Sequence, residues 1–286
     1  MRKIIVITGQ TSTGKTHLAQ RMKKELNGEL INCDSRQIYR HLDVVTGKDI
    51  SEIHLYDIVN PKEHFSSFDY VVAALPVIKK ILRFGKTPIL VGGTYLYIKH
   101  LLYGMDTERI PPDWELRSKL QSRTIVELQS HLKRISPDMF GKLNNSDRNN
   151  PRRLIRKIEI ALYRQKGKNF PTRKTLADTL GIPDLSTEII GLAFKSRGIL
   201  ATSIRRRVEK RIKAGAIDEV SKLLALGYTK SDPGLQTIGY QQLIPVVEKK
   251  ISLEKAVEDW ITKEIQYAKR QYTFMKKDET IQWKYI

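Results

Sequence analysis

Residues 9–16 read GQTSTGKT and have the spacing of a phosphate-binding loop. In such loops, backbone N–H groups and a helix N-terminus hold phosphate oxygens, Lys15 supplies a mobile cation, and the Thr16 hydroxyl can ligate Mg²⁺. The residues expected around the phosphates are Gly9, Thr11, Ser12, Thr13, Gly14, Lys15 and Thr16. The motif alone does not say whether the phosphates are cleaved by water, passed to an acceptor or expelled as a leaving group.

A second candidate group follows the strands expected at residues 29–33 and 88–91. Asp34 comes directly after the first strand, and Thr94 follows Gly92 and Gly93 after the second. The carboxyl ends of parallel strands face the ligand crevice, so both side chains are expected to look toward the phosphate loop. Asp34 could ligate a metal or take a proton from a nucleophile. A plain helix N-cap, before the DSRQ run, is an open alternative.

Basic residues form a third group. Arg152, Arg153 and Arg156 fall on one expected helix, and Arg205, Arg206, Arg207 and Arg211 on another. Arg207 and Arg211 are four residues apart and therefore share a helix face, where guanidinium groups can bind phosphate through paired hydrogen bonds. Segments 235–243 and 267–277 mix cations, glutamine and aromatic rings, a composition that suits RNA. Solvated helix faces and amphipathic core helices are the alternatives.

The elements that must position these groups alternate between strands and helices. Strands are expected at residues 3–8, 29–33, 88–91 and 187–194, with a weaker one at 55–59, and helices at 15–27, 67–84 and 95–104. This order predicts an α/β fold with a mostly parallel sheet covered by helices on both faces. Residues 106–148 have helical periodicity without a strand and predict a small all-helical insertion. The core then comprises residues 1–105 and 149–286, the second part ending in basic helices.

The net charge is +20, from 51 Lys+Arg against 31 Asp+Glu, across 286 residues. Such an excess favours a polyanionic partner, most plausibly nucleic acid, over a small-molecule substrate alone. The single cysteine, Cys33, excludes an internal disulfide and fits a reducing cytosol. No apolar run reaches the roughly 18 residues of a membrane span, so a cytoplasmic protein without a membrane partner is expected, with a monomer as the default. The histidines show no zinc-ligand spacing.

Together, these segments resemble the tRNA dimethylallyltransferase (isopentenyltransferase) family. The stretches that carry the resemblance are GQTSTGKTHLA, NCDSRQIYRHLDVVTGKD, HLYDIVNPKEHFSSFDY, GKTPILVGGTYLYI, NPRRLIRKIEIAL, LQTIGYQQL and AKRQYTFMKK. They occur in the family's order and cover most of the chain. The phosphate loop is unspecific by itself, whereas DSRQIY, PILVGGTYLY and AKRQYTFM are specific.

The resemblance implies a reaction in which the exocyclic amine of the adenosine 3′ of the anticodon attacks dimethylallyl diphosphate. Diphosphate then leaves as one piece, with Mg²⁺ as cofactor. It implies that Asp34 is the general base, that Thr94 holds the amine, and that Arg207 joins Lys15 and Thr16 at the departing diphosphate, with Arg211 beside it. The target base would be flipped out of the anticodon loop. The implied tRNA-contacting residues are Asp34, Ser35, Arg36, Gln37, Thr94, Arg117, Arg152, Arg153, Arg156, Gln236, Gly239, Tyr240, Gln241, Lys269, Arg270 and Gln271.

The chain departs from the family pattern in four places. Tyr95 stands where glycine is common and is expected to narrow the pocket, VVTGKD replaces the usual IGTAKP, the insertion is short, and no C-terminal zinc-finger pattern follows. Three other functions stay open: prenylation of free adenine nucleotides, a P-loop kinase of small molecules, and a non-catalytic RNA-binding protein. The first needs no large basic surface, the second gives DSRQIY no place, and the third leaves Asp34 and Thr94 without a role.

Overall fold

The computed structural model describes residues 2–49, 52–104, 110–167 and 174–286. The chain divides into two compact units. The first contains Met1–Leu101 with Ala177–Ile286, and the second is Leu102–Leu176. In the part of the chain that the structure describes, no helix is both long and apolar enough to cross a membrane.

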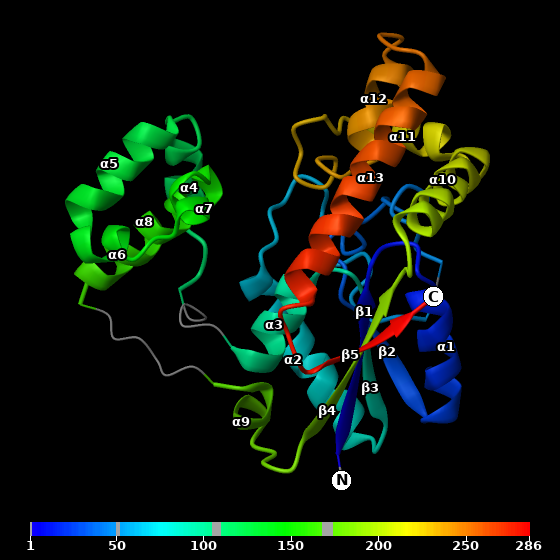
Figure 1. Cartoon of the computed structure of the whole chain (residues 1–286), viewed down its shortest axis with the longest axis horizontal. Coiled ribbons are helices and arrows are strands. Elements are labelled where there is room, and N and C mark those ends of the chain that lie inside the picture. Colours follow the sequence, from blue (N-terminus) through cyan, green and yellow to red (C-terminus); the bar gives the residue numbers. More distant parts are fainter. Residues whose placement is uncertain (1, 50–51, 105–109, 168–173) are drawn as a thin grey trace. The chain divides into compact units, whose positions relative to one another are not determined.

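The first unit is built on a five-stranded, wholly parallel sheet with the strand order β2-β3-β1-β4-β5 (Figure 1). The strands are β1 (Lys3–Gly9), β2 (Gly28–Asn32), β3 (Thr87–Val91), β4 (Ser186–Ala193) and β5 (Ile281–Tyr285). The first four confirm the expected strands, shifted by at most two residues. β5 was not expected, because its IQWKY sequence is short and follows a long basic helix.

The strand expected at residues 55–59 does not form. The described residues of this segment make one isolated bridge, Tyr39 with Val59, and a second bridge joins Ile31 to His54 just before it. Its apolar side chains pack individually rather than as part of a strand: Val59, for example, is buried against the helical part of the unit. Short apolar runs of this kind cannot be assigned by pattern alone.

Helices cover both faces of the sheet, as the alternation predicted. Ile5 and Ile7 of β1 pack with Ala19 of α1 (Lys15–Glu25), whereas Thr8 points the other way and donates to Met275 Sδ of α13. Figure 1 shows α1 on one side of the sheet and α2 (Ser67–Arg83) with α3 (Tyr95–Tyr103) on the other. Strands buried on both faces explain why their sequences are continuously apolar rather than alternating.

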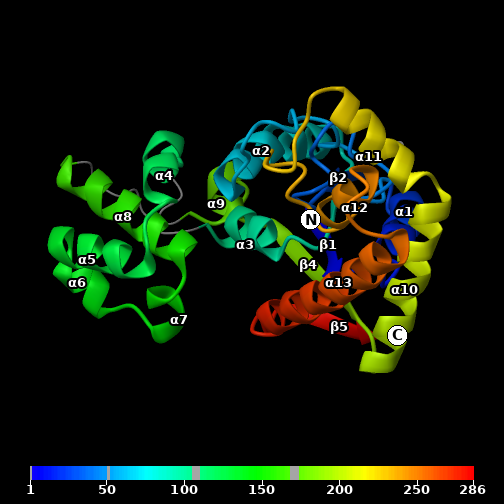
Figure 2. The same ribbon diagram turned by 90° about the horizontal axis from the view of Figure 1, so that it is seen from above.

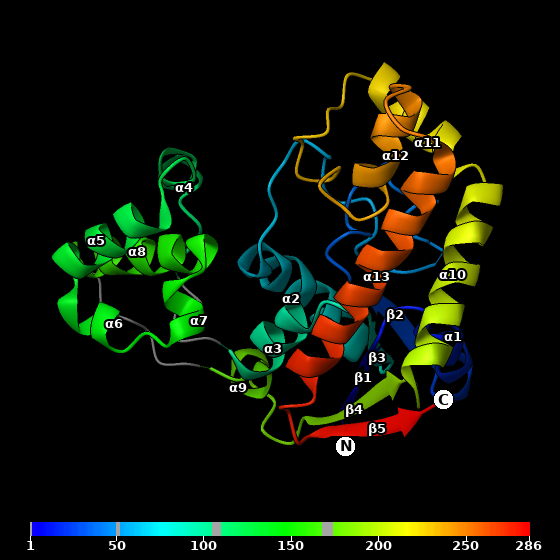
Figure 3. The same ribbon diagram turned by 45° about the horizontal axis from the view of Figure 1, so that its top comes forward.

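The C-terminal helices form a second core within the same unit. They are α10 (Arg197–Lys213), α11 (Ala216–Ala225), α12 (Tyr240–Val247) and α13 (Leu253–Met275), preceded by the short α9 (Leu176–Leu180). Trp260, Tyr240 and Leu243 are fully buried there, together with Leu42 and Val45 from the segment after β2. Figure 3 shows α10 and α13 running side by side above the sheet. This core therefore fixes residues 38–45 against helices that begin only at Arg197, much later in the chain.

The second unit is a small helical bundle (Figure 2). Its helices are α4 (Trp114–Leu120), α5 (Ile125–Ile135), α6 (Pro137–Gly141), α7 (Asn145–Arg148) and α8 (Pro151–Gln165). Leu128 and Leu132 of α5 share one apolar cluster with Leu154 and Ile158 of α8.

The boundary expected at residue 148 is therefore wrong, since α8 belongs to the helical unit rather than to the second part of the core. The many basic residues of α8 made it read as a basic helix of the core, although its apolar side chains pack against α5. The expected start at residue 106 lies outside the described residues.

Candidate active site

The phosphate-binding loop connects β1 to α1 and has the strained backbone that its motif requires. Gly9, Ser12 and Gly14 have φ of 127°, 69° and 77°. A Cβ on Gly9 would lie 2.1 Å from the backbone oxygen of Leu192, so only glycine fits there. Gly14 directly precedes α1, and the positive helix end faces the cavity in front of the loop. These features make a concave surface suited to an anion.

Helices α10 and α13 hold this loop from two sides. Ser203 of α10 exchanges hydrogen bonds with Ser12, with the two hydroxyl oxygens 2.9 Å apart. One turn later, Arg207 donates to Thr11 Oγ1. From α13, Gln271 Oε1 accepts from the Thr11 N–H at 3.1 Å, while its Nε2 donates to the Gly93 carbonyl at 3.0 Å. Gln271 thus links the phosphate loop to the turn after β3.

Asp34 and Thr94 are brought together because β2 and β3 are neighbours in the sheet. Thr94 Oγ1 accepts from the Ser35 N–H at 2.9 Å, and the Thr94 N–H donates to the Cys33 carbonyl at 3.2 Å. Asp34 Oδ1 accepts from the Arg36 N–H at 2.9 Å. Among the described residues, Oδ2 of Asp34 accepts no hydrogen bond. One oxygen therefore caps the turn and the other remains available for a ligand.

A cavity of about 630 Å³ joins the phosphate loop to Asp34. Every expected phosphate residue except Gly9 lines it, as do Arg207 and Arg211. Gln37 and Gly93 also lie along it, whereas Thr94, which directly follows Gly93, is not among the lining residues. Lining residues that the sequence predictions did not single out include Lys48, Tyr56 and Lys210. Lys210 could have been expected from helical spacing, since it is three residues after Arg207 and four after Arg206, which also lines the cavity. Nothing in the local sequence marks Tyr56, whereas Tyr267, another lining residue, begins the segment 267–277 that was expected at RNA.

The cations of this cavity differ in their surroundings. Lys15 Nζ folds back onto the Gly9 and Gln10 carbonyls at 3.2 and 2.5 Å. Burial, reinforced by the Arg207 guanidinium, lowers the pKa of the Lys15 amine to about 7. Arg211 is buried, donates to the Thr46 carbonyl at 3.0 Å and lies 3.6 Å from Glu264, and burial also lowers its pKa. An anion that neutralises this charge is therefore favoured.

The residues suited to Mg²⁺ are few. In the described ranges, no group of three or more His, Cys, Asp or Glu side chains gathers in the manner of a metal site. The Thr16 hydroxyl lines the cavity and makes no side-chain hydrogen bond to the described residues. A hydroxyl beside bound phosphates fits Mg²⁺, which keeps several waters and takes much of its coordination from substrate oxygens.

Four of the expected tRNA-contacting residues have structural roles instead. Tyr240 is fully buried and donates to Glu219 Oε1 at 2.6 Å, and Gln271 is 7% exposed. Gly239 allows the turn before α12, because a Cβ there would lie 2.4 Å from Val45. Gln241 Nε2 donates to the Lys230 and Leu235 carbonyls. Within the LQTIGYQQL motif, Gly239 and Tyr240 therefore serve a turn and core packing, whereas Gln236 is exposed.

Tyr95 does not narrow the cavity. Its ring packs edge-on against Phe274 at 5.5 Å between centroids, and its hydroxyl donates to Asp278. The expectation of a narrowed pocket is therefore wrong, because the side chain is turned toward the end of α13. It fastens the turn that carries Thr94.

In the helical unit, three of the expected arginines are paired with carboxylates. Arg117 makes paired hydrogen bonds of 2.6 and 2.8 Å to the buried Glu159, and Arg156 binds the same carboxylate at 2.9 Å. Arg153 pairs with Asp147 at 2.7 Å. Arg152, Gln236, Lys269 and Arg270 are exposed. Exposed cations of this kind remain available for a polyanion.

Replacing Gly92 with alanine is expected to displace the Asp34 turn. A Cβ at this position would lie 2.1 Å from the Cys33 carbonyl oxygen and 2.8 Å from the Asp34 nitrogen. A displacement of about 1 Å at a reacting group can cost about 10²-fold in rate. Enzymatic turnover of the folded Gly92→Ala variant would measure this, with Gly198→Ala as control, since no atom lies within 3.4 Å of a Cβ there. Turnover equal to that of the control would show that the turn tolerates displacement.

Comparison with known proteins places this geometry in a family. The family model described as IPP transferase matches residues 37–278. The tRNA dimethylallyltransferase of Caldanaerobacter subterraneus subsp. tengcongensis is 35% identical, over 99% of this chain and 92% of that protein. The corresponding protein of Acetivibrio thermocellus is 36% identical, over 99% and 91%.

Solved structures agree with the sequence relatives. The full-length tRNA isopentenylpyrophosphate transferase of Bacillus halodurans superposes with a TM-score of 0.69 at 32% identity, covering 100% of this chain and 90% of that one. A eukaryotic dimethylallyltransferase that acts on tRNA gives 0.75 at 26% identity, covering 96% and 70%. A family match over most of the chain, relatives above 30% identity along almost its whole length, and a shared fold lead to one conclusion: this chain belongs to the IPP transferase family.

Proposed function

We propose that this protein transfers a dimethylallyl group from dimethylallyl diphosphate to the exocyclic amine of the adenosine 3′-adjacent to the anticodon of tRNA. The observation that carries the proposal is that one cavity holds both the phosphate loop and Asp34. Family membership supplies the substrates, since the named relatives are tRNA dimethylallyltransferases.

The residues of the chain divide the chemistry between two ends of the cavity. At one end, loop N–H groups, Lys15 and Arg207 bind the diphosphate and stabilise the negative charge that grows as it leaves. At the other, the Asp34 carboxylate takes the proton from the amine while nitrogen attacks the first carbon of the prenyl group. The carbon–oxygen bond to diphosphate breaks and no phosphoryl bond is cleaved, which fits the lack, after β3, of the strand-end acid that helps to hold the metal in hydrolysing P-loop proteins.

Thr94 acts in this scheme through the turn that it holds. Its hydroxyl already accepts from the Ser35 N–H, which fixes the residue beside Asp34. The Thr16 hydroxyl and diphosphate oxygens would hold Mg²⁺, which supplies charge neutralisation for the leaving group.

The protein is proposed to act as a monomer in the cytoplasm. All of the residues that line the cavity belong to the first unit, which is consistent with a site formed by one chain. The single cysteine is buried, and burial raises the pKa of its thiol to about 12, which suits an inert structural role.

The direct test is incubation with dimethylallyl diphosphate, Mg²⁺ and either tRNA, AMP or ATP, followed by mass spectrometry of the nucleosides. Prenylated adenosine from tRNA alone is expected. Equal activity on AMP would replace the proposal with prenylation of free nucleotides, and phosphorylated acceptor would replace it with a kinase.

The basic excess makes a separate prediction about salt. Each protein cation that displaces condensed counterions from RNA steepens the fall of log affinity with log salt. Replacing Arg270, which is exposed, with alanine is expected to reduce that slope by about one unit and to weaken all tRNAs alike. Binding of a good and a poor tRNA at several salt concentrations measures both effects.

Arg205→Ala is the matched control, because Arg205 is held by Glu258 through bonds of 2.6 and 3.0 Å. The slope of log tRNA affinity against log salt should change less in Arg205→Ala than in Arg270→Ala. A flat salt response of the wild type would argue against an extended RNA-binding surface.

A further inference from the structure

The segment of residues 43–49 forms one wall of the cavity. Five of its residues line the space: Asp43, Val44, Gly47, Lys48 and Asp49. The segment is a tight turn rather than part of a helix or strand, with the Gly47 N–H donating to the Asp43 carbonyl at 2.8 Å. An irregular wall of this kind keeps its shape only if other elements hold it.

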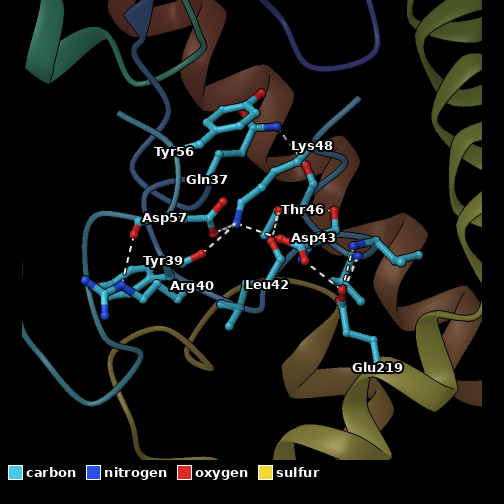
Figure 4. Close-up of polar contacts among 12 residues, drawn as sticks. Gln37, Tyr39, Arg40, Leu42, Asp43, Thr46, Lys48, Tyr56, Asp57 and Glu219 are labelled. Carbon is cyan, nitrogen blue, oxygen red and sulfur yellow. Dashed lines mark hydrogen bonds and ion pairs between the residues drawn. The ribbon is translucent and has the colours of Figure 1, made fainter. Parts of the chain in front are cut away.

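One carboxylate outside the cavity holds the start of this wall. Glu219, on the first turn of α11, accepts from the N–H groups of Asp43, Val44 and Val45 at 2.8, 2.6 and 3.1 Å (Figure 4). Its Oε1 also accepts from the buried Tyr240 hydroxyl at 2.6 Å. Hydrogen bonds to an ionised acceptor are about twice as strong as neutral ones. Four of them on one side chain fix the turn against the helical core.

A cation holds the other end. Lys48 Nζ contacts the Tyr39 carbonyl at 2.7 Å, Asp43 at 2.7 Å and Asp57 at 2.5 Å, as Figure 4 shows. The Lys48 side chain is only 5% exposed, although the carboxylates of Asp43 and Asp57 are more than half exposed. The wall is thus held by Glu219 at its beginning and by Lys48 at its end.

The wall connects the two ends of the cavity through a single carbonyl. The Thr46 carbonyl accepts from Arg211 Nη2 at 3.0 Å and from Gln37 Nε2 at 3.2 Å. Gln37 also donates to the Gly47 carbonyl at 2.8 Å and accepts from the Tyr56 hydroxyl at 3.2 Å. Arg211 lies beside the proposed diphosphate site, whereas Gln37 follows Asp34 by three residues. A shift of the wall would move both groups.

We propose that Glu219 is a positioning residue, which aligns the donor and acceptor ends of the cavity by holding residues 43–45. It touches neither substrate. The activity readout rests on the proposed prenyl transfer, whereas the structural readout does not.

The test compares Glu219→Gln with two controls. The amide keeps the size of the side chain but offers one acceptor oxygen and turns N–H donors toward the turn. Asp218→Asn removes the same charge from the same turn of α11, where Asp218 is exposed. Tyr240→Phe removes only the fourth donor to Glu219.

Hydrogen exchange of the full-length protein gives the structural readout. In Glu219→Gln, the amides of residues 43–45 should exchange about tenfold faster or more, while those of β1 and β3 stay protected. Asp218→Asn should resemble wild type, and Tyr240→Phe, which keeps the three bonds to residues 43–45, should show a smaller increase than Glu219→Gln. Unchanged exchange at residues 43–45 would overturn the proposal. Equal loss of protection throughout the sheet would also overturn it, because Glu219 would then stabilise the whole unit rather than this turn.

Kinetics give the second readout. Misalignment at both ends should lower kcat by about 10–10²-fold in Glu219→Gln rather than raise the KM of one substrate. A wild-type kcat with faster local exchange would overturn the positioning role. If wild type itself fails to prenylate tRNA, the proposed function falls, while hydrogen exchange still decides whether Glu219 holds the wall.

Discussion

Replacing Asp34 with alanine is expected to lower turnover by about 10²–10⁴-fold, the range for removal of a positioned proton acceptor. The structure supports this size of effect because Asp34 lines the same cavity as the phosphate loop and keeps one carboxylate oxygen without a bond to described residues. Binding of dimethylallyl diphosphate should change little. Single-turnover rates with tRNA measure the chemical step directly.

Asp34→Asn separates the two roles of this carboxylate. Its side-chain oxygen can still accept from the Arg36 N–H, so the turn stays capped. If Asp34 is the base, both variants should be equally inactive. Less than a tenfold loss in Asp34→Asn would show that the carboxylate serves only as a cap.

Removal of the Lys15 ammonium is expected to reduce turnover by about 10²–10³-fold, as for other groups that stabilise developing charge. Lys15→Met keeps the length of the side chain without its charge. Affinity for tRNA should be nearly unchanged, because the amine lies inside the cavity against the Gly9 and Gln10 carbonyls. Equal losses of tRNA and diphosphate affinity would indicate a collapsed loop instead.

The same lysine predicts a pH dependence of diphosphate binding. Burial holds its pKa near 7 in the free protein, and a bound anion must raise that pKa. Binding therefore takes up a proton above about pH 7, and affinity should fall by up to tenfold per pH unit from there to the raised pKa. Calorimetry of diphosphate binding between pH 6.5 and 8.5 would measure this.

The Lys15→Met variant serves as the control for ionisation of the diphosphate itself. Only the difference in diphosphate affinity between wild type and Lys15→Met is due to Lys15. That difference should shrink as pH rises. A constant difference across the range would show that Lys15 stays fully charged in the free loop.

The same lowered pKa affects stability with a definite sign. A lysine whose folded pKa lies below its unfolded value opposes folding while it is protonated. This cost should diminish as pH rises from about 7 toward the unfolded value, and an anion in the loop offsets it at neutral pH. An anion such as the proposed diphosphate is therefore expected to stabilise the folded protein at neutral pH.

Local sequence determined the elements that carry chemistry. The GQTSTGKT motif fixed the strand, loop and helix start, since its glycines are required by backbone angles that other residues rarely adopt. Continuous apolar runs gave four of the five parallel strands, because strands buried on both faces need no polar alternation. Placement of Asp34 and Thr94 at neighbouring strand ends followed from the same topology.

Tertiary packing decided what the side chains do. Tyr240 and Gln271 were expected at an RNA surface, yet both are buried. Tyr240 is held by Glu219, which is 21 residues away in sequence, and Gln271 by Gly93 and Thr11, which are 178 and 260 residues away. Arg117 and Arg156 acquire a shared buried partner, Glu159, that helical spacing from Arg117 cannot reveal. The sequence shows which side chains are charged, whereas the ion-pair partner of each depends on which helices and strands pack together.

One physical reason explains why local sequence determines some features and tertiary packing determines others. Strand and loop identity arise from backbone angles and local burial, which a few neighbouring residues specify. The wall at residues 43–49, the boundary after α8 and the edge strand β5 depend on contacts between distant segments, such as Glu219 with Val44. The sequence by itself therefore determined the phosphate loop, Asp34 and the sheet that aligns them, and only the folded chain decided how the rest of the cavity is held around them.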